Sequence, residues 1–81
     1  MKSFLVQKRS DGRVNGSIYT EAQLISYISM SDCSDEEYRL FDISVFGEVR
    51  EIFYKGWQLG CLIELTDGSG KTVVSGYGIE H

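Results

Sequence analysis

The spacing of apolar residues changes once along this chain, and that change limits the folds it can adopt. Leu24, Ile25 and Ile28 recur at the spacing of a helix with one buried stripe. From residue 39 onward, apolar and polar residues instead alternate with a period of two, which is typical of strands with one buried face. We therefore predict an α+β fold in which the helix covers one face of a sheet.

The length of the chain allows one hydrophobic core. With 81 residues, 42% of them hydrophobic, the chain is expected to bury roughly 60–65% of the surface that its unfolded form exposes. That is enough for one sheet packed on one helix, and the apolar content argues against disorder. We expect a single domain over residues 1–81, which excludes an enzyme built from separate cofactor-binding and catalytic domains.

The predicted sheet is antiparallel, has four to five strands and carries one helix on one face. The element order is β-α-β-β-β-β, with strands expected at 4–9, 39–45, 49–54, 59–66 and 71–79. Phe41, Ile43 and Val45 are expected to share the buried face of the second of these strands. The pattern does not decide whether residues 14–19 also pair as a strand.

Glycines leave one face of the closing strand bare. The residues that alternate on its other face are Val73, Ser75, Tyr77 and Ile79. We interpret Gly76 and Gly78 as a bulge or as a close approach of another backbone. A neighbouring aromatic side chain, Trp57 or Tyr54, is a candidate to cover the bare face.

Two capping signals mark helix starts. Thr20 and Gln23 have the spacing of a capping box, so the helix is expected to begin directly after Thr20. Ser34 and Glu37 repeat that spacing, which predicts a second short helical turn over residues 35–38.

No residue pattern predicts catalysis, a cofactor or a metal site. Residues 68–72, Gly-Ser-Gly-Lys-Thr, end like a phosphate-binding loop, but they lack its first glycine and are followed by two valines. We therefore interpret residues 67–70 as a hairpin turn. The single histidine, His81, has no partner at zinc-ligand spacing. We expect a protein that is not an enzyme.

Two features are candidate interaction sites. Trp57 follows a Lys-Gly turn and, with Tyr54, is suited to a binding hot spot at a sheet edge. The alternative is that the Trp57 indole packs on the sheet as core. The second feature is the acidic run Asp35, Glu36 and Glu37, which either stabilises a helix N-terminus and is otherwise solvated, or mimics nucleic-acid phosphates.

The formal net charge of −4 is unevenly distributed. Residues 1–19 carry +3, whereas residues 20–48 carry seven acids against one arginine. Lys8, Arg9 and Arg13 form a basic cluster, which we interpret as solvated turn charges. Because nucleic-acid binders usually have a basic balance, we do not expect direct nucleic-acid binding.

The sequence predicts a cytoplasmic location. The first residues hold only three consecutive apolar side chains, too few for a signal peptide. No apolar run approaches the roughly 20 residues that span a bilayer. Cys33 and Cys61 are then expected to be free thiols, with Cys61 in the core.

The N-terminal third resembles a known group of proteins. The segments that carry the likeness are residues 11–14 (Asp-Gly-Arg-Val), 19–24 (Tyr-Thr-Glu-Ala-Gln-Leu) and 27–28 (Tyr-Ile). Their order of strand, turn, cap and helix is similar to the opening of small uncharacterised proteins of bacterial phages and integrative elements. The resemblance implies a bacterial or phage-borne setting rather than an activity.

We therefore expect a small, soluble, non-enzymatic protein-interaction module from a bacterium or phage. It would bind a protein partner through the Trp57 edge or the acidic run, and no cofactor is expected. The alternative is an acidic inhibitor that mimics nucleic acid, of the anti-defence type. The pattern leaves open whether edge strands of two copies pair as a homodimer.

Overall fold

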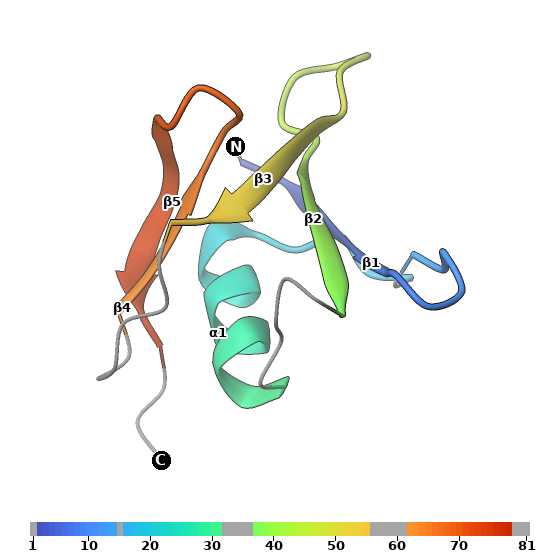
Figure 1. Ribbon diagram of the computed structural model, residues 1–81, viewed down its shortest axis with the longest axis horizontal. Helices are drawn as coiled ribbons and strands as arrows, with labels where there is room; N and C mark the ends of the chain where they lie inside the picture. The colour runs from blue at the N-terminus through green and yellow to red at the C-terminus, as the bar shows by residue number, and fades with distance from the viewer. Residues whose placement is uncertain (1, 15, 32–36, 56–61, 79–81) are drawn as a thin grey trace.

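One helix and five strands make up the described part of the chain. The computed structural model describes residues 2–14, 16–31, 37–55 and 62–78. The elements are β1 (Phe4–Lys8), α1 (Glu21–Ser31), β2 (Tyr38–Asp42), β3 (Arg50–Tyr54), β4 (Leu62–Thr66) and β5 (Thr72–Tyr77). This order confirms the predicted α+β fold with one helix and an antiparallel sheet (Figure 1).

The sheet follows the order of the chain, β1-β2-β3-β4-β5, and every neighbouring pair is antiparallel. The sheet curls, so that β1 and β2 stand on one side of α1 and β4 and β5 on the other (Figure 1). The strand β3 joins the two halves. Leu40 of β2 is opposite both Val6 of β1 and Ile52 of β3.

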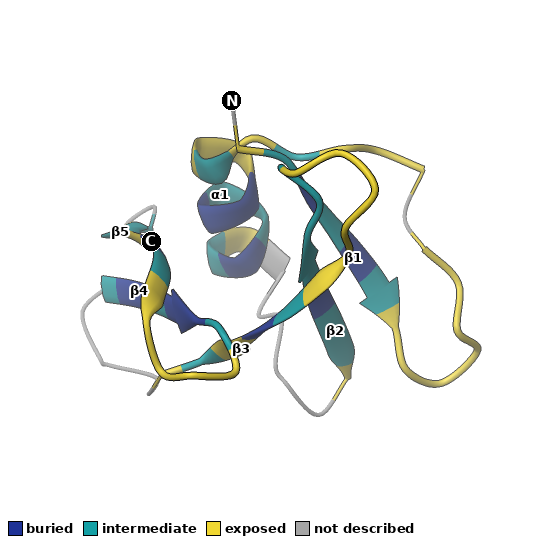
Figure 2. Cartoon of the chain, turned by 90° about the horizontal axis from the view of Figure 1, so that it is seen from above, coloured by how far each residue is buried: buried dark blue, intermediate teal, exposed yellow. Residues whose placement is uncertain are grey.

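The core lies between α1 and the concave face of the sheet. Leu24, Ile25 and Ile28 form the buried stripe of α1, as their spacing predicts. The buried apolar residues of the sheet are Phe4, Val6, Leu40, Ile52, Ile63, Leu65 and Val74. Each strand contributes at least one of them, so the helix and the five strands share one core (Figure 2).

The start of α1 has the predicted capping box. Thr20 N–H donates to Gln23 Oε1 (3.0 Å), and Gln23 N–H donates to Thr20 Oγ1 (3.2 Å). These reciprocal bonds satisfy backbone donors that the first turn of a helix leaves without partners. The capping box therefore defines where the helix begins.

The prediction of a second helical turn over residues 35–38 is wrong for its last residue, Tyr38. Tyr38 begins β2 and is paired with Lys8 of β1. Asp35 and Glu36 lie outside the described residues. Pairing with β1 therefore outweighs the capping signal that precedes Tyr38 in the sequence.

The buried face of β2 is the reverse of the predicted one. Leu40 is buried, whereas Phe41 is half-buried on the opposite face and Val45 is exposed. The strand ends at Asp42 instead of continuing to residue 45. Because Leu40 and Phe41 are adjacent apolar residues, the alternation has two phases, and pairing with β1 and β3 selects the one that buries Leu40.

The bare face of β5 packs against α1. Val74 is buried, whereas Ser75 and Tyr77 are exposed, so the face that carries Gly76 is the inner one. A Cβ built on Gly76 would lie only 2.5 Å from Ile25 Cδ1. The glycines do allow a close approach, but side chains make it, and not another backbone as the sequence predicted.

The element that makes this close approach is α1, not an aromatic side chain. A Cβ built on Gly78 would lie 2.9 Å from Ser29 Cβ. Ser29 is half-buried on the side of α1 that faces β5. The two glycines therefore let the helix lie directly on the last strand.

The predicted hairpin turn at residues 67–70 is confirmed. Asp67 Oδ1 accepts the N–H groups of Ser69 (2.9 Å) and Lys71 (3.0 Å). Gly70 has a φ of +89°, in the region that favours glycine.

Of the described residues before α1, Val14 and Tyr19 pair with β1 without belonging to a strand. Tyr19 exchanges two backbone hydrogen bonds of 2.9 Å with Phe4, and Lys8 N–H donates to the Arg13 carbonyl (2.8 Å). The pairings Phe4–Tyr19 and Gln7–Val14 are isolated bridges. They occupy the outer edge of β1 near both of its ends.

Candidate interaction site

The interaction residues predicted from the sequence are only partly described. Trp57, Asp35 and Glu36 lie outside the described residues. Tyr54, the last residue of β3, is half-buried and packs against the core. Glu37 is exposed and directly precedes β2. Because β2 and β3 are antiparallel, Tyr54 and Glu37 lie at the same end of the sheet, but Tyr54 is turned toward the core.

The described acidic residues do not form one acidic face. Glu37 precedes β2 and Asp42 ends it, so the length of the strand separates them. Ion pairs join Glu21 to Lys2, Glu48 to Arg50, Glu51 to Arg39 and Glu64 to Lys55. This arrangement does not favour phosphate mimicry, which needs unpaired carboxylates gathered on one surface.

A cluster of exposed apolar residues lies in the connection between β2 and β3. The exposed fraction is 51% for Val45, 102% for Phe46 and 67% for Val49. We call these three residues the apolar tip. Single exposed apolar side chains are ordinary, but three within five residues, including a fully exposed aromatic ring, make this loop a candidate contact surface.

A tight turn presents Phe46 to solvent. Glu48 N–H donates to the Val45 carbonyl (3.0 Å), and Gly47 has a φ of +81°. A positive φ at the third residue of a four-residue turn favours glycine there. Phe46 is the second residue of this turn and makes its corner.

Hydrogen bonds hold the base of the same loop. Ile43 N–H donates to the Ser3 carbonyl (2.9 Å), and Ser3 N–H donates to Ser44 Oγ (2.9 Å). Asp42 Oδ1 in turn accepts the Ser44 N–H (2.9 Å). The apolar tip is therefore carried by a loop that is tied to the N-terminal segment and has a defined conformation.

The apolar tip was not predicted from the sequence. Val45 continues the period-two alternation and was therefore expected to be buried in a strand. The signal that could have found the tip is the Phe46-Gly47 pair that follows the alternating run. A glycine at that place supplies the positive φ of a tight turn and so exposes the residue before it.

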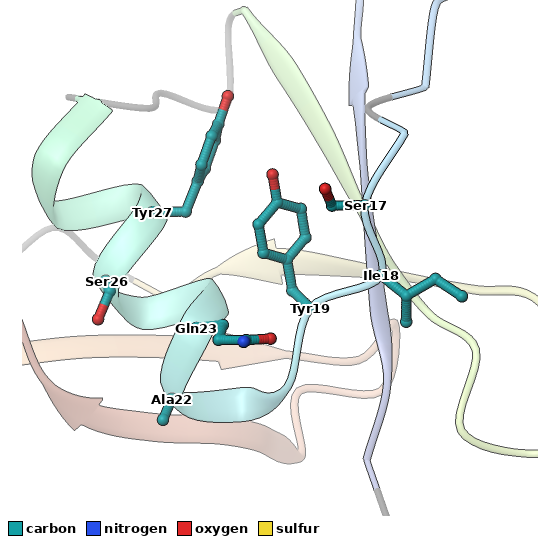
Figure 3. Close-up of a pocket in the computed structure, with 7 residues that line it drawn as sticks. All are labelled: Ser17, Ile18, Tyr19, Ala22, Gln23, Ser26 and Tyr27. Atoms are coloured by element: carbon teal, nitrogen blue, oxygen red, sulfur yellow. The ribbon is translucent and has the colours of Figure 1, made fainter.

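A second surface feature is an open hollow between α1 and the segment before it. It has a volume of about 520 Å³ and is lined by Ser17, Ile18, Tyr19, Ala22, Gln23, Ser26 and Tyr27. Figure 3 shows the Tyr19 and Tyr27 rings next to each other, with centroids 5.3 Å apart. The lining is neutral, so it offers ring faces and hydrogen-bonding groups rather than an acid–base pair.

A further hollow of about 510 Å³ lies beside Tyr38, which meets Tyr27 edge to face with ring centroids 6.4 Å apart. Its other lining residues are Lys8, Arg9, Ser10 and Glu37. This hollow combines part of the predicted basic cluster with one residue of the acidic run. It therefore does not present a surface of one charge sign.

Two carboxyl groups have a lowered pKa, and a structural contact explains each. A side-chain hydrogen bond from Arg39 lowers the pKa of Glu51, and one from Ser69 lowers the pKa of Asp67. Neither carboxylate lines either hollow. Both shifts therefore belong to structural ion pairs and turns.

Among the residues that the structure describes, no group of three or more His, Cys, Asp or Glu side chains is placed to hold a metal ion. No helix in the described part of the chain is long and apolar enough to cross a membrane.

Comparison with known proteins identifies no relative of this chain. The chain matches no protein-family model, and no curated protein or solved structure is significantly similar to it. The case for a function therefore rests on the geometry of the described residues.

Proposed function

We propose that this protein is a non-enzymatic interaction module that inserts the apolar tip into an apolar pocket of a partner protein. The observation that carries the proposal is Phe46, whose side chain is 102% exposed on a hydrogen-bonded turn. The likeness of residues 11–28 to phage and integrative-element proteins supports a bacterial or phage-borne setting.

The energetics of the apolar tip favour binding. Moving one Phe side chain from water into an apolar pocket contributes roughly 1.5–3 kcal/mol. Val45 and Val49, exposed on either side of the turn, add apolar area around that anchor. Binding hot spots have this arrangement of a central anchor surrounded by contacts that exclude water.

The geometry of the loop also lowers the cost of binding. The hydrogen-bonded turn at residues 45–48 and the bonds between Ser3 and residues 43–44 restrict the conformations of the loop. A loop that is ordered before it meets its partner loses less conformational entropy on binding than a flexible segment does.

Site-specific photocrosslinking identifies the partner. A photoreactive phenylalanine analogue replaces Phe46 in one variant and Met30 in the control variant. Met30 is also exposed, at 67%, but lies in the last turn of α1, whose C-terminal end points away from the β2–β3 loop (Figure 1). After irradiation in lysate of the native host, the proposal predicts a crosslinked protein that is specific to position 46. The same crosslinked proteins from both positions, or none from position 46, would contradict the proposal.

A further inference from the structure

The two outer strands of the sheet, β1 and β5, differ in how their edges are occupied. The edge of β1 is covered near both ends, because Phe4 is bonded to Tyr19 and Lys8 to Arg13. No described residue pairs with the outer side of β5 as a strand or bridge. Within the described part of the chain, the edge available for further pairing is therefore that of β5.

The sequence of β5 lacks charge and proline, two of the features that protect exposed edges. Edge strands are usually protected by charged residues, prolines, bulges or shortness, and the pairing of β4 with β5 has one irregularity, between Leu65 and Thr66. Residues 72–77, Thr-Val-Val-Ser-Gly-Tyr, contain no charge and no proline, and β5 is the longest strand described. One contact does reach this edge, since Lys2 Nζ donates to the Val73 carbonyl (2.7 Å). A carbonyl oxygen has two lone pairs, so this contact leaves one for a strand N–H.

We propose that β5 pairs antiparallel with β5 of a second copy of this chain, about a twofold axis at Ser75. Self-pairing of this kind is isologous, so each residue meets its counterpart at the same distance from the axis. In this register Val73 lies opposite Tyr77 of the second copy, and Ser75 lies opposite Ser75. The result is a continuous sheet of ten strands across two copies, which leaves the apolar tip outside the interface.

The side chains of β5 fit this register on its outer face. Tyr77 is 77% exposed, whereas Val73 is half-buried and packs against the core. The exposed hydroxyls of the two Ser75 residues meet at the centre, where no like charges are opposed.

The inner face fits the same register. Val74 lies opposite Gly76 of the second copy, so a branched side chain is set beside a position that has none. Gly76 is already covered by Ile25 of α1. Because the paired segment is only about five residues long, we expect a weak dimer that forms in the micromolar to millimolar range rather than an obligate one.

A cysteine at the axis tests the register. Residues directly opposite each other in an antiparallel pair have Cα atoms about 4.5–5.5 Å apart, which is within the range of a disulfide. We expect the Ser75→Cys variant to form a disulfide-linked dimer on mild oxidation, seen on a non-reducing gel. The controls are the parent chain, with its own two cysteines, and Tyr77→Cys, whose two sulfurs would be about 13 Å apart along the strands.

The outcomes of the crosslinking are distinct. Dimer from Ser75→Cys well above both controls supports the proposed register. No Ser75→Cys dimer above the parent chain, or equal crosslinking from Tyr77→Cys, would overturn it.

Sedimentation equilibrium tests the dimer without a crosslink. The average mass of the parent chain should rise with concentration, whereas Ser75→Lys, which sets two positive charges against each other at the axis, should remain monomeric. Ser75 is exposed, so this variant is expected to keep its fold. Phe46→Ala should associate like the parent, which separates this inference from the proposed function. A parent chain that is monomeric throughout, or a Ser75→Lys variant that associates equally well, would contradict self-pairing.

Discussion

At the residue scale, the contact between Gly76 and Ile25 shows how one missing side chain sets the packing of the helix. A Cβ on Gly76 would lie 2.5 Å from Ile25 Cδ1. Gly76→Ala should therefore overpack the core and lower the free energy of unfolding by about 1–3 kcal/mol. Ile25→Val removes that same Cδ1 atom and alone should cost about 0.5–1.5 kcal/mol.

The double variant Gly76→Ala/Ile25→Val makes this a quantitative test. Its loss of stability in urea unfolding should be smaller than the sum of the two single losses by at least about 0.5 kcal/mol. Strict additivity would show that the added methyl group does not meet Ile25.

The ion pair between Arg39 and Glu51 predicts part of the acid sensitivity. Arg39 Nη2 lies 2.7 Å from Glu51 Oε1 and Arg39 Nε lies 2.9 Å from Oε2. The hydrogen bond from Arg39 lowers the pKa of Glu51 below its ordinary value of 4.5. A depressed carboxyl pKa stabilises the fold above the ordinary value, and the contribution is lost as the pH falls through the folded-state pKa.

The free energy of unfolding of Glu51→Gln should therefore depend less on pH in the acid range than that of the parent chain. We expect urea midpoints of the parent chain to fall between pH 5 and pH 3, and those of Glu51→Gln to fall less. An identical fall in both proteins would mean that this ion pair does not contribute. Because both side chains are partly exposed, high salt should reduce the difference.

At the element scale, the start of α1 depends on its capping box. Thr20→Ala removes the hydroxyl that accepts the Gln23 N–H and should lower the free energy of unfolding by about 1 kcal/mol. Thr20→Ser keeps that hydroxyl and serves as the control. Thr20 is exposed, so neither substitution creates a buried cavity that would also lower stability. Equal losses in the two variants by urea unfolding would contradict the capping role.

The turn that carries the apolar tip makes a second prediction at this scale. A Cβ on Gly47 would meet nothing within 4 Å, so substitution there acts only through the positive φ of +81°. Gly47→Ala should cost about 1 kcal/mol in stability. Gly47→Asn should cost less, since Asn tolerates the left-handed region. No difference between Ala and Asn would argue against the turn geometry.

The helix and the strands could be predicted from the sequence. Which face of each element is buried could be predicted only in part. The stripe of Leu24, Ile25 and Ile28 and the capping box specified α1 because both are local signals. Neighbouring apolar residues such as Leu40 and Phe41 allow two phases of alternation, and only pairing with other strands selects one. Tyr38 likewise joined β2 because strand pairing, a non-local contact, outweighed a local capping signal.

At the scale of the whole molecule, the curled sheet directs different surfaces to different places. The apolar tip lies in the connection between β2 and β3, and β5 lies across the helix from β1 (Figure 1). The candidate site could not be predicted because exposure of Val45 and Phe46 depends on where β2 ends. Alternation alone does not show that end.

The central claim is that Phe46 is the anchor of a protein-binding surface. The most direct test is calorimetric titration of the photocrosslinked partner, once purified, into the parent chain, Phe46→Ala and the control Met30→Ala. Because Phe46 is fully exposed, its loss should leave the thermal midpoint unchanged. The account predicts a Kd at least about tenfold weaker for Phe46→Ala and an unchanged Kd for Met30→Ala. Equal Kd values for the parent chain and Phe46→Ala would contradict it.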